Sequence, residues 1–390
     1  MIKNSVRHSW YAVTLLTTGH FFSDFYANFL PALLPIVMPK LGLSLTMSGL
    51  LVMILSFTSN VLQPFFGYIM DKKSLNWLLL LTIPGGAIFI CLTGLADTKT
   101  MLFALVTLSG LAVSIFHPLG TSLISKVTNT SKLGLSISIF VAGGNLGFAF
   151  APVIIVYFTE NYGLSALPLL IIPSLVLSVA LYQSGLSKPS PRLVTTKKSL
   201  SNLTKFSEQI DLIKLNIAMG LRAWTHVSVT TFLPVLLVSQ GHSATFAGIM
   251  LTIFLIGAAL GGLYGGYISD RLGCKKVIIA SLALGILPTY LFLSSLEINW
   301  WTWIVLFLCG AGLQGSAPSS LVWAQRLLPN NAGMASGMML GLSFGLGGIG
   351  AAITGALADS ITLATSLLLT TIPLALAALI TITIPERPIR

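Results

Sequence analysis

The sequence predicts an all-α membrane protein of twelve transmembrane helices in two pseudo-symmetric six-helix halves. Composition is the first observation behind this prediction: of 390 residues, 55% are hydrophobic and only 8% are charged, whereas ordinary globular domains carry about 25% charged residues. The second observation is that apolar stretches long enough to cross a bilayer, about 20 residues each, recur from end to end. The third is that landmarks in the first half of the chain recur in the second.

The apolar stretches are hydrophobic on every side, which is typical of membrane helices rather than of amphipathic surface helices. The first of them is too long for a cleavable signal, contains Asp24 and lacks a small-residue cleavage site. The predicted spans are 10–39, 45–70, 76–96, 100–126, 133–159, 164–185, 211–239, 244–269, 276–296, 300–327, 332–358 and 362–384.

The net charge of +11 is explained by where the cations lie. Except for Lys40, Lys99 and Arg222, every Lys and Arg falls at a terminus, or in or beside an even-numbered connection between spans. Cytoplasmic loops of membrane proteins carry an excess of Lys and Arg, so we expect both termini in the cytoplasm. The charge indicates topology, and we expect the lipid bilayer rather than nucleic acid as its surroundings.

Repeated landmarks indicate that the chain is a duplication. Gly67-Tyr68-Ile69-Met70-Asp71-Lys72 ends the second span, and Gly266-Tyr267-Ile268-Ser269-Asp270-Arg271 ends the eighth, about 200 residues later. Gly110 with Pro118 in the fourth span is matched by Gly310 with Pro318 in the tenth. The only long polar stretch separates the two sets. We therefore divide the chain into a first half at 1–184, a cytoplasmic linker at 185–210 and a second half at 211–390, a plan common among secondary transporters.

Asp24 lies within the first span, where an ionisable side chain costs about 2.5–3.5 kcal/mol on insertion scales and usually has a partner or a function. His20, Asp24 and Asn28 are spaced i, i+4, i+8 and so share one face of a helix. Because burial disfavours the charged carboxylate, Asp24 is a candidate proton-coupling site with His20 as partner or relay. A static pair of Asp24 with a His or an Arg, which would only lock the helix, is the alternative.

Arg222 and His226 stand at i and i+4 in the seventh span. The planar guanidinium suits a carboxylate or a phosphonate, so Arg222, with His226, is a candidate for binding an anionic substrate in a central cavity. A structural ion pair between Arg222 and Asp24 is the alternative, and the two roles are compatible. Asn28, Asn145 and Gln314 complete the candidate substrate-binding residues.

His117, directly before Pro118, is a further candidate for proton coupling, and a hydrogen-bonded structural histidine is an equally good interpretation of it. Cys91, Cys274 and Cys309 lie in or beside apolar stretches and suggest neither disulfides nor a metal site. No phosphate-binding loop follows a strand, so a gradient rather than bound ATP is the expected energy source. We expect no cofactor, no metal and no enzymatic activity.

Several motifs resemble a known family. The two G-x-x-x-D-[RK] elements (Gly67, Asp71, Lys72 and Gly266, Asp270, Arg271) are similar to the loop motif of the major facilitator superfamily, which implies a cytoplasmic gate that latches the two halves. His20-Phe21-Phe22-Ser23-Asp24, Phe116-His117-Pro118, Gly143-Gly144-Asn145-Leu146-Gly147 and the glycine-rich run from Gly333 to Asp359 resemble the fosmidomycin-resistance branch of that superfamily. The resemblance implies export of small toxic compounds, including an anionic phosphonate antibiotic, in exchange for protons.

The predicted function is therefore secondary active transport by alternating access. We expect a proton-coupled exporter of a small anionic or amphipathic compound, monomeric, in the inner membrane of a bacterium. A dedicated metabolite or siderophore carrier, working in either direction, is the main alternative, and a membrane sensor that has lost transport is a weaker one.

Overall fold

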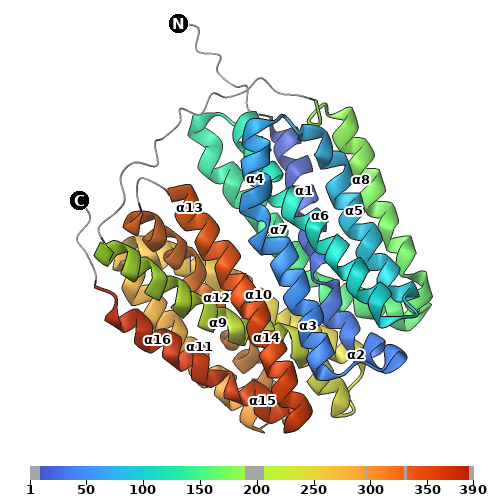
Figure 1. Ribbon diagram of the computed structural model, residues 1–390, viewed down its shortest axis with the longest axis vertical. Coiled ribbons are helices and arrows are strands. Elements are labelled where there is room, and N and C mark those ends of the chain that lie inside the picture. Colours follow the sequence, from blue (N-terminus) through green and yellow to red (C-terminus); the bar gives the residue numbers. More distant parts are fainter. Residues whose placement is uncertain (1–8, 189–205, 296, 329–331, 386–390) are drawn as a thin grey trace, which may run out of the picture. The chain divides into compact units, whose positions relative to one another are not determined.

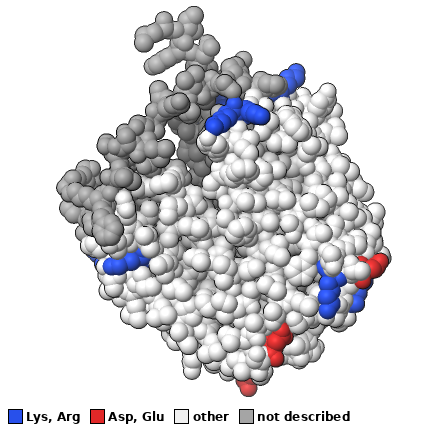
Figure 2. Space-filling view, viewed as in Figure 1, with Lys and Arg blue, Asp and Glu red and all other residues white. Residues whose placement is uncertain are grey.

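The computed structural model describes residues 9–188, 206–295, 297–328 and 332–385, and these residues form helices and turns with no strand (Figure 1). Twelve helical segments are long and apolar enough to cross a membrane. The predicted fold class and number of spans are therefore confirmed. The face shown in Figure 2 carries few charged side chains, as expected where lipid replaces water.

Several spans consist of more than one helix, because prolines and short π or 3-10 turns interrupt the α-helical hydrogen bonds. The first six spans are formed by α1 (Trp10–Ala27) with α2 (Phe29–Leu41), α3 (Leu45–Ser56) with α4 (Gln63–Lys72), α5 (Leu79–Leu92), α6 (Lys99–Val127), α7 (Leu133–Tyr162) and α8 (Ile172–Gln183). The last six are formed by α9 (Phe206–Ser239), α10 (Ala244–Leu272), α11 (Cys274–Ser295), α12 (Trp300–Leu327), α13 (Ala332–Gly337) with α14 (Ser343–Ser360), and α15 (Leu363–Leu369) with α16 (Thr371–Thr383).

The predicted linker at 185–210 falls largely on residues 189–205, outside the described part of the chain. α9 begins at Phe206, so the last residues of that predicted linker are helical. Glu208 and Gln209 are good helix formers, and they extend the helix beyond its apolar part. A boundary drawn where hydrophobicity begins therefore falls too late.

The chain forms two compact units whose boundaries differ from the midpoint of the duplication. Unit 1 comprises Met1–Leu33 and Leu62–Leu193, and unit 2 comprises Leu34–Val61 and Val194–Arg390. α3 therefore packs with helices of the second half. The boundary between Val61 and Leu62 coincides with the end of the π turn Phe57–Val61. At this point the second span passes from unit 2 to unit 1.

Unit 1 is built around α1, which contacts α5, α6 and α7. An apolar core shared by these helices includes Leu16, Ile83, Phe116 and Phe140, all almost fully buried. α1 approaches α7 closely because glycines face it: a Cβ at Gly143 would be 2.5 Å from Thr17 Cγ2, and one at Gly147 would collide with the carbonyl oxygen of Phe21. Small residues permit such tight crossings in membrane helices.

The Gly and Pro landmarks of the duplication meet in the same way in both units. A Cβ at Gly67 of α4 would lie 3.6 Å from Cβ of Pro118 in α6, and one at Gly266 of α10 would lie 3.4 Å from Cβ of Pro318 in α12. The repeat in the sequence therefore corresponds to a repeated helix contact.

Within unit 2, α3 lies along α14 with backbone against backbone (Figure 1). A Cβ at Gly49 would be 2.6 Å from the carbonyl oxygen of Ala351, and a Cβ at Gly355 would collide with the carbonyl oxygen of Leu45. Hydrogen bonds that Asp359 accepts close the same end of this contact. Its Oδ1 accepts from the backbone N–H of Leu45 (3.0 Å), and its Oδ2 accepts from the N–H and the hydroxyl of Thr46 (2.9 and 2.6 Å).

Asp359 thereby caps a helix that is distant in sequence. The first N–H groups of a helix have no partner within it; Ser44 Oγ accepts from Met47 N–H (3.1 Å), and Asp359 satisfies the two before it. A carboxylate at a helix N-terminus also interacts favourably with the helix dipole. α3 and α14 are therefore joined by packing and by a charge-assisted cap.

We expect Gly49→Ala to destabilise the protein, because the added methyl must push α3 away from the Ala351 carbonyl. Overpacking of this kind costs about 1–3 kcal/mol, so the unfolding temperature of purified protein in detergent should fall by several degrees. Gly134→Ala in α7 is the matched control, since a Cβ there meets nothing within 4 Å. Equal unfolding temperatures for the two variants would contradict the tight α3–α14 contact.

Candidate functional site

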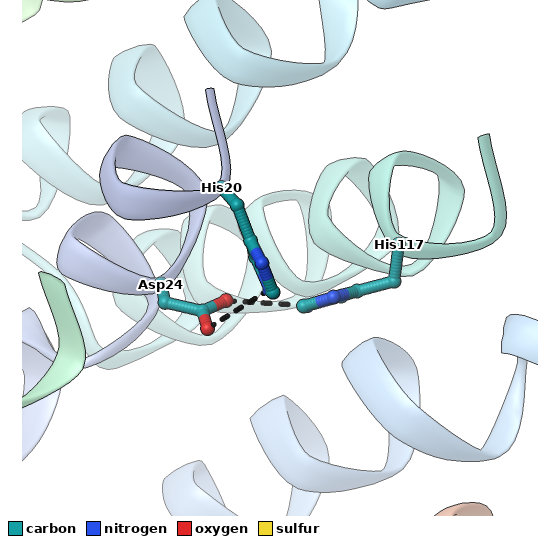
Figure 3. A group of neighbouring side chains, drawn as sticks. All are labelled: His20, Asp24 and His117. Atoms are coloured by element: carbon teal, nitrogen blue, oxygen red, sulfur yellow. Dashed lines mark ion pairs between the residues drawn. The ribbon is translucent and has the colours of Figure 1, made fainter. Parts of the chain in front are cut away.

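The carboxylate of Asp24 lies between two imidazoles inside unit 1. Oδ2 is 3.3 Å from Nε2 of His20, one turn earlier in α1, and Oδ1 is 3.3 Å from Nε2 of His117 in α6. Figure 3 shows the two rings converging on the carboxylate from different helices. The three side chains are mostly buried, with 9, 17 and 23% of His20, Asp24 and His117 exposed. The structure therefore brings together all three residues predicted for proton coupling.

The ring of His20 is held by α7. Nδ1 lies 2.8 Å from the backbone carbonyl oxygen of Phe140, and the ring stacks on the Phe140 ring with centroids 4.2 Å apart. The ring of His117 stands edge-on to that of His20, at a centroid distance of 5.1 Å. Backbone and aromatic contacts thus fix the direction in which His20 points.

Gly144 gives the His20–Asp24 pair its space. An ideal Cβ at Gly144 would lie 2.5 Å from Oδ2 of Asp24 and 2.6 Å from Nε2 of His20. Any larger residue at position 144 would displace His20 or Asp24. In the Gly143-Gly144-Asn145-Leu146-Gly147 run, the glycines provide the surface that receives α1.

Asn28 lies on the same side of the first span as His20. Its Nδ2 donates a 2.8 Å hydrogen bond to the carbonyl oxygen of Phe148 in α7, two turns beyond the Phe140 carbonyl that faces His20. The predicted common face of His20 and Asn28 is confirmed. The bond of Asn28 joins two helices, and a role in substrate binding stays a prediction.

Arg222 is the largest of the fully buried side chains and lies in unit 2, with 2% of its surface exposed. Its Nη1 donates to the backbone carbonyl of Leu313 (2.9 Å) and to Oε1 of Gln314 (2.6 Å), both in α12. Its Nε has no hydrogen-bond partner among the described residues. The guanidinium is therefore anchored through Nη1 while its Nε donor is unused, and two of the residues predicted for substrate binding, Arg222 and Gln314, are in direct contact.

His226 lies one turn beyond Arg222 and stacks on Phe254 at a centroid distance of 5.3 Å. It is buried, and in the described part of the chain its Nδ1 also lacks a partner. Asn145, the remaining residue predicted for substrate binding, is exposed on α7 in unit 1. A direct pair between Asp24 and Arg222 stays a prediction, since the two residues belong to different units.

The two predicted gate motifs hold their cations alike. Lys72 Nζ lies 4.2 Å from the centroid of the Tyr68 ring. The Arg271 guanidinium lies 4.6 Å from that of Tyr267, whose hydroxyl also accepts a hydrogen bond from it. Both are i, i+4 contacts on exposed helix ends. Asp270 is exposed, and the latch predicted for these motifs remains a prediction.

Two groups that hold these helices together have no signal in the pattern of side chains. The Phe140 carbonyl is a backbone group, and its contact with His20 depends on how α1 and α7 pack. In the sequence, Asp359 stands out only as the end of a glycine-rich run. Asp is a residue type suited to capping the N-terminus of a helix, but nothing in the sequence connects it to the start of α3.

Comparison with known proteins identifies the chain. The family model described as Major Facilitator Superfamily matches residues 16–225 and 215–390. The chain belongs to the major facilitator superfamily. It is 28% identical over 362 residues to the fosmidomycin resistance protein of Escherichia coli K12, covering 90% of this chain and 87% of that one. It is 26% identical over 267 residues to the multidrug resistance protein MdtG of Yersinia enterocolitica, covering 65% and 64% of the two chains.

Among solved structures, a bacterial homologue of the human lysosomal transporter Spinster, in an inward-facing and occupied conformation, superimposes with a TM-score of 0.78. The alignment covers 95% of this chain and 96% of that one at 16% identity, so it establishes the fold. The chain is thus a multi-pass membrane transporter of this superfamily, and its resemblance to the fosmidomycin-resistance branch is confirmed.

Proposed function

We propose that the protein is a proton-coupled exporter of a small anionic or amphipathic compound, acting in the inner membrane of a bacterium. The observation that carries the proposal is the Asp24 carboxylate held between His20 and His117 inside the first half of the bundle. Two relatives are named for resistance to fosmidomycin and to several drugs, which supports transport out of the cell. Neither an enzymatic activity nor a cofactor is required.

The His–Asp–His cluster has the chemistry of a proton-binding site. A carboxylate and two imidazoles can share a proton and keep the cluster electrically neutral, which a buried site in a membrane favours. A proton reaching Asp24 from outside and leaving toward the cytoplasm would drive the opposite movement of a substrate. The alternative, a static cluster that locks α1, α6 and α7, predicts transport that is insensitive to a proton gradient.

Arg222 is the proposed recognition group for the anion. Its Nη1 is held by Leu313 and Gln314, so its orientation is preorganised. Its Nε and the Nδ1 of His226, one turn further along α9, have no partners among the described residues, and an oxyanion is the kind of ligand that could accept from such groups. Asn28, Asn145 and Gln314 stay in the proposal as secondary contacts.

The α3–α14 contact supports alternating access. α3 belongs to the first half of the duplication and α14 to the second, and Asp359 caps α3 across that division. Alternating access requires the two halves to part at one face of the membrane and then at the other. We therefore assign the Asp359 cap to the state in which this end is closed. In the opposite state, the G-x-x-x-D-[RK] motifs would close the cytoplasmic end.

Asp24→Asn should abolish proton-driven export, because an amide cannot exchange the proton. In an efflux-deficient bacterium we expect the wild-type protein to protect against at least one of fosmidomycin, other phosphonates, polycarboxylate chelators and lipophilic cations. The variant should protect no better than the strain without the protein, because export that cannot exchange a proton has no driving force. Glu297→Gln, at an exposed carboxylate, is the control. Full protection by well-expressed Asp24→Asn would exclude the coupling role, and protection by neither protein would favour a dedicated metabolite carrier.

Arg222→Gln should raise the KM for an anionic substrate by about tenfold or more, corresponding to a lost charged hydrogen bond of about 1.5–3 kcal/mol. Arg222→Lys keeps the charge without the planar fork and should restore part of the affinity. Uptake of the protected compound into inside-out vesicles measures both. An unchanged KM in Arg222→Gln, at an unfolding temperature equal to that of Arg222→Lys, would leave Arg222 a structural role only.

A disulfide between Thr46→Cys and Asp359→Cys should stop transport, because it prevents α3 from leaving α14. Transport by the doubly substituted protein is compared before oxidation, after oxidation and after reduction, and activity should return with reductant. Each single substitution serves as control, and the native Cys91, Cys274 and Cys309 are buried. Undiminished transport by the fully cross-linked protein would rule out opening at this end.

A further inference from the structure

The ring of His20 is bonded to a group that can only accept a hydrogen. The Phe140 carbonyl oxygen lies 2.8 Å from Nδ1 of His20, so Nδ1 must carry a hydrogen and donate it. Stacking on the Phe140 ring holds the imidazole in the same place, and a flipped ring would lose the carbonyl contact. α7 therefore fixes the tautomer of His20.

The fixed tautomer decides what His20 presents to Asp24. When His20 is neutral, its one ring hydrogen is on Nδ1, and Nε2 turns a lone pair toward Oδ2 of Asp24, 3.3 Å away. Two acceptors facing each other in a buried site repel. A proton on either Nε2 or Oδ2 converts this contact into a hydrogen bond, so the contact needs one proton beyond the hydrogen on Nδ1.

His117 differs from His20 in this respect. None of its described contacts fixes the hydrogen on its Nδ1, so a neutral His117 can carry its hydrogen on Nε2 and donate it to Oδ1 of Asp24 across 3.3 Å. No additional proton is needed. The two histidines, equally distant from the carboxylate, therefore have unequal roles.

We propose that the transported proton resides on the contact between His20 Nε2 and Asp24 Oδ2, and that the Phe140 carbonyl and the bare Cα of Gly144 are the positioning groups that reserve this contact for it. The inference rests on the proposed proton coupling and assigns its location. His117 stabilises the other carboxylate oxygen. α7 contributes Gly144 and the Phe140 carbonyl to this site, neither of which titrates.

Release of the proton then acts on helix packing. Without it, Nε2 and Oδ2 repel, while His20 remains tied to α7 through Phe140. Because a Cβ at Gly144 would already touch both partners, α7 packs directly over the contact. The change from attraction to repulsion is therefore transmitted to the α1–α7 interface, which is a route from protonation to movement.

The deciding measurement is the tautomer of His20. The full-length protein, labelled with ¹⁵N-histidine and reconstituted in lipid bilayers, is observed by solid-state NMR as pH is raised, with the five histidines assigned by single replacements. We expect Nδ1 of His20 to stay protonated throughout, with changes confined to Nε2, and neutral His117 to carry its hydrogen on Nε2. A neutral His20 with its hydrogen on Nε2 would overturn the inference.

Variants give an independent test of the same assignment. His20→Asn retains a donor for the Phe140 carbonyl but lacks Nε2, so the pH midpoint of the Asp24 infrared bands, identified by their absence in Asp24→Asn, should shift. His117→Gln should shift that midpoint less. Gly144→Ala should shift the midpoint of the transport pH profile by about one unit, and Gly134→Ala should not. Identical pH profiles for the two alanine variants would contradict the positioning role of Gly144.

The two proposals fail separately. Transport that ignores the proton gradient, together with the expected His20 tautomer, would refute proton coupling while leaving the local geometry correct. Proton-driven transport with a His20 that carries its hydrogen on Nε2 would refute the assignment of the proton to this contact alone.

Discussion

The burial of one carboxylate in an apolar bundle constrains most of unit 1. A charge at the centre of a bilayer is costly, so Asp24 needs neighbours that share its charge or its proton. Those neighbours are His20 on α1 and His117 on α6, and α7 holds His20 in turn through the Phe140 carbonyl. The glycines of α7 follow from this requirement, because only bare backbone lets α7 approach close enough to orient the His20 ring.

The two halves of the duplication have similar helix arrangements but contain buried charges of opposite sign. Asp24 in the first span contacts His117 in the fourth, and Arg222 in the seventh contacts Gln314 in the tenth. Each pair therefore joins corresponding spans of the two halves, at positions that are about one helical turn apart in the repeat. The Gly67–Pro118 and Gly266–Pro318 contacts show that the helices carrying the second member of each pair are placed alike. Corresponding spans of the two halves thus carry a carboxylate in one and a guanidinium in the other.

Much of this could be predicted from the sequence because the membrane makes the signals strong. Twelve spans follow from hydrophobicity alone, and the i, i+4 spacing of His20 and Asp24 already places them on one helix face. The sequence predicts the same role for Asp24 and His117 but not their contact, because the contact depends on how α1 packs on α6. Backbone groups such as the Phe140 carbonyl carry no sequence signal, and the capping of α3 by Asp359 joins positions more than 300 residues apart that no local pattern connects.

The two buried charges differ in a way that suits a division of labour. A carboxylate can be neutralised by a proton, whereas a guanidinium stays charged at any physiological pH. Unit 1 therefore contains the variable charge and unit 2 the constant one. A constant cation with an unused donor favours an anionic ligand whatever the pH, while the variable site can change its interactions as a proton arrives or leaves. The proposed exchange of protons for an anion would use one site of each kind, and their placement on different halves of a duplicated bundle would let each respond to its own ligand.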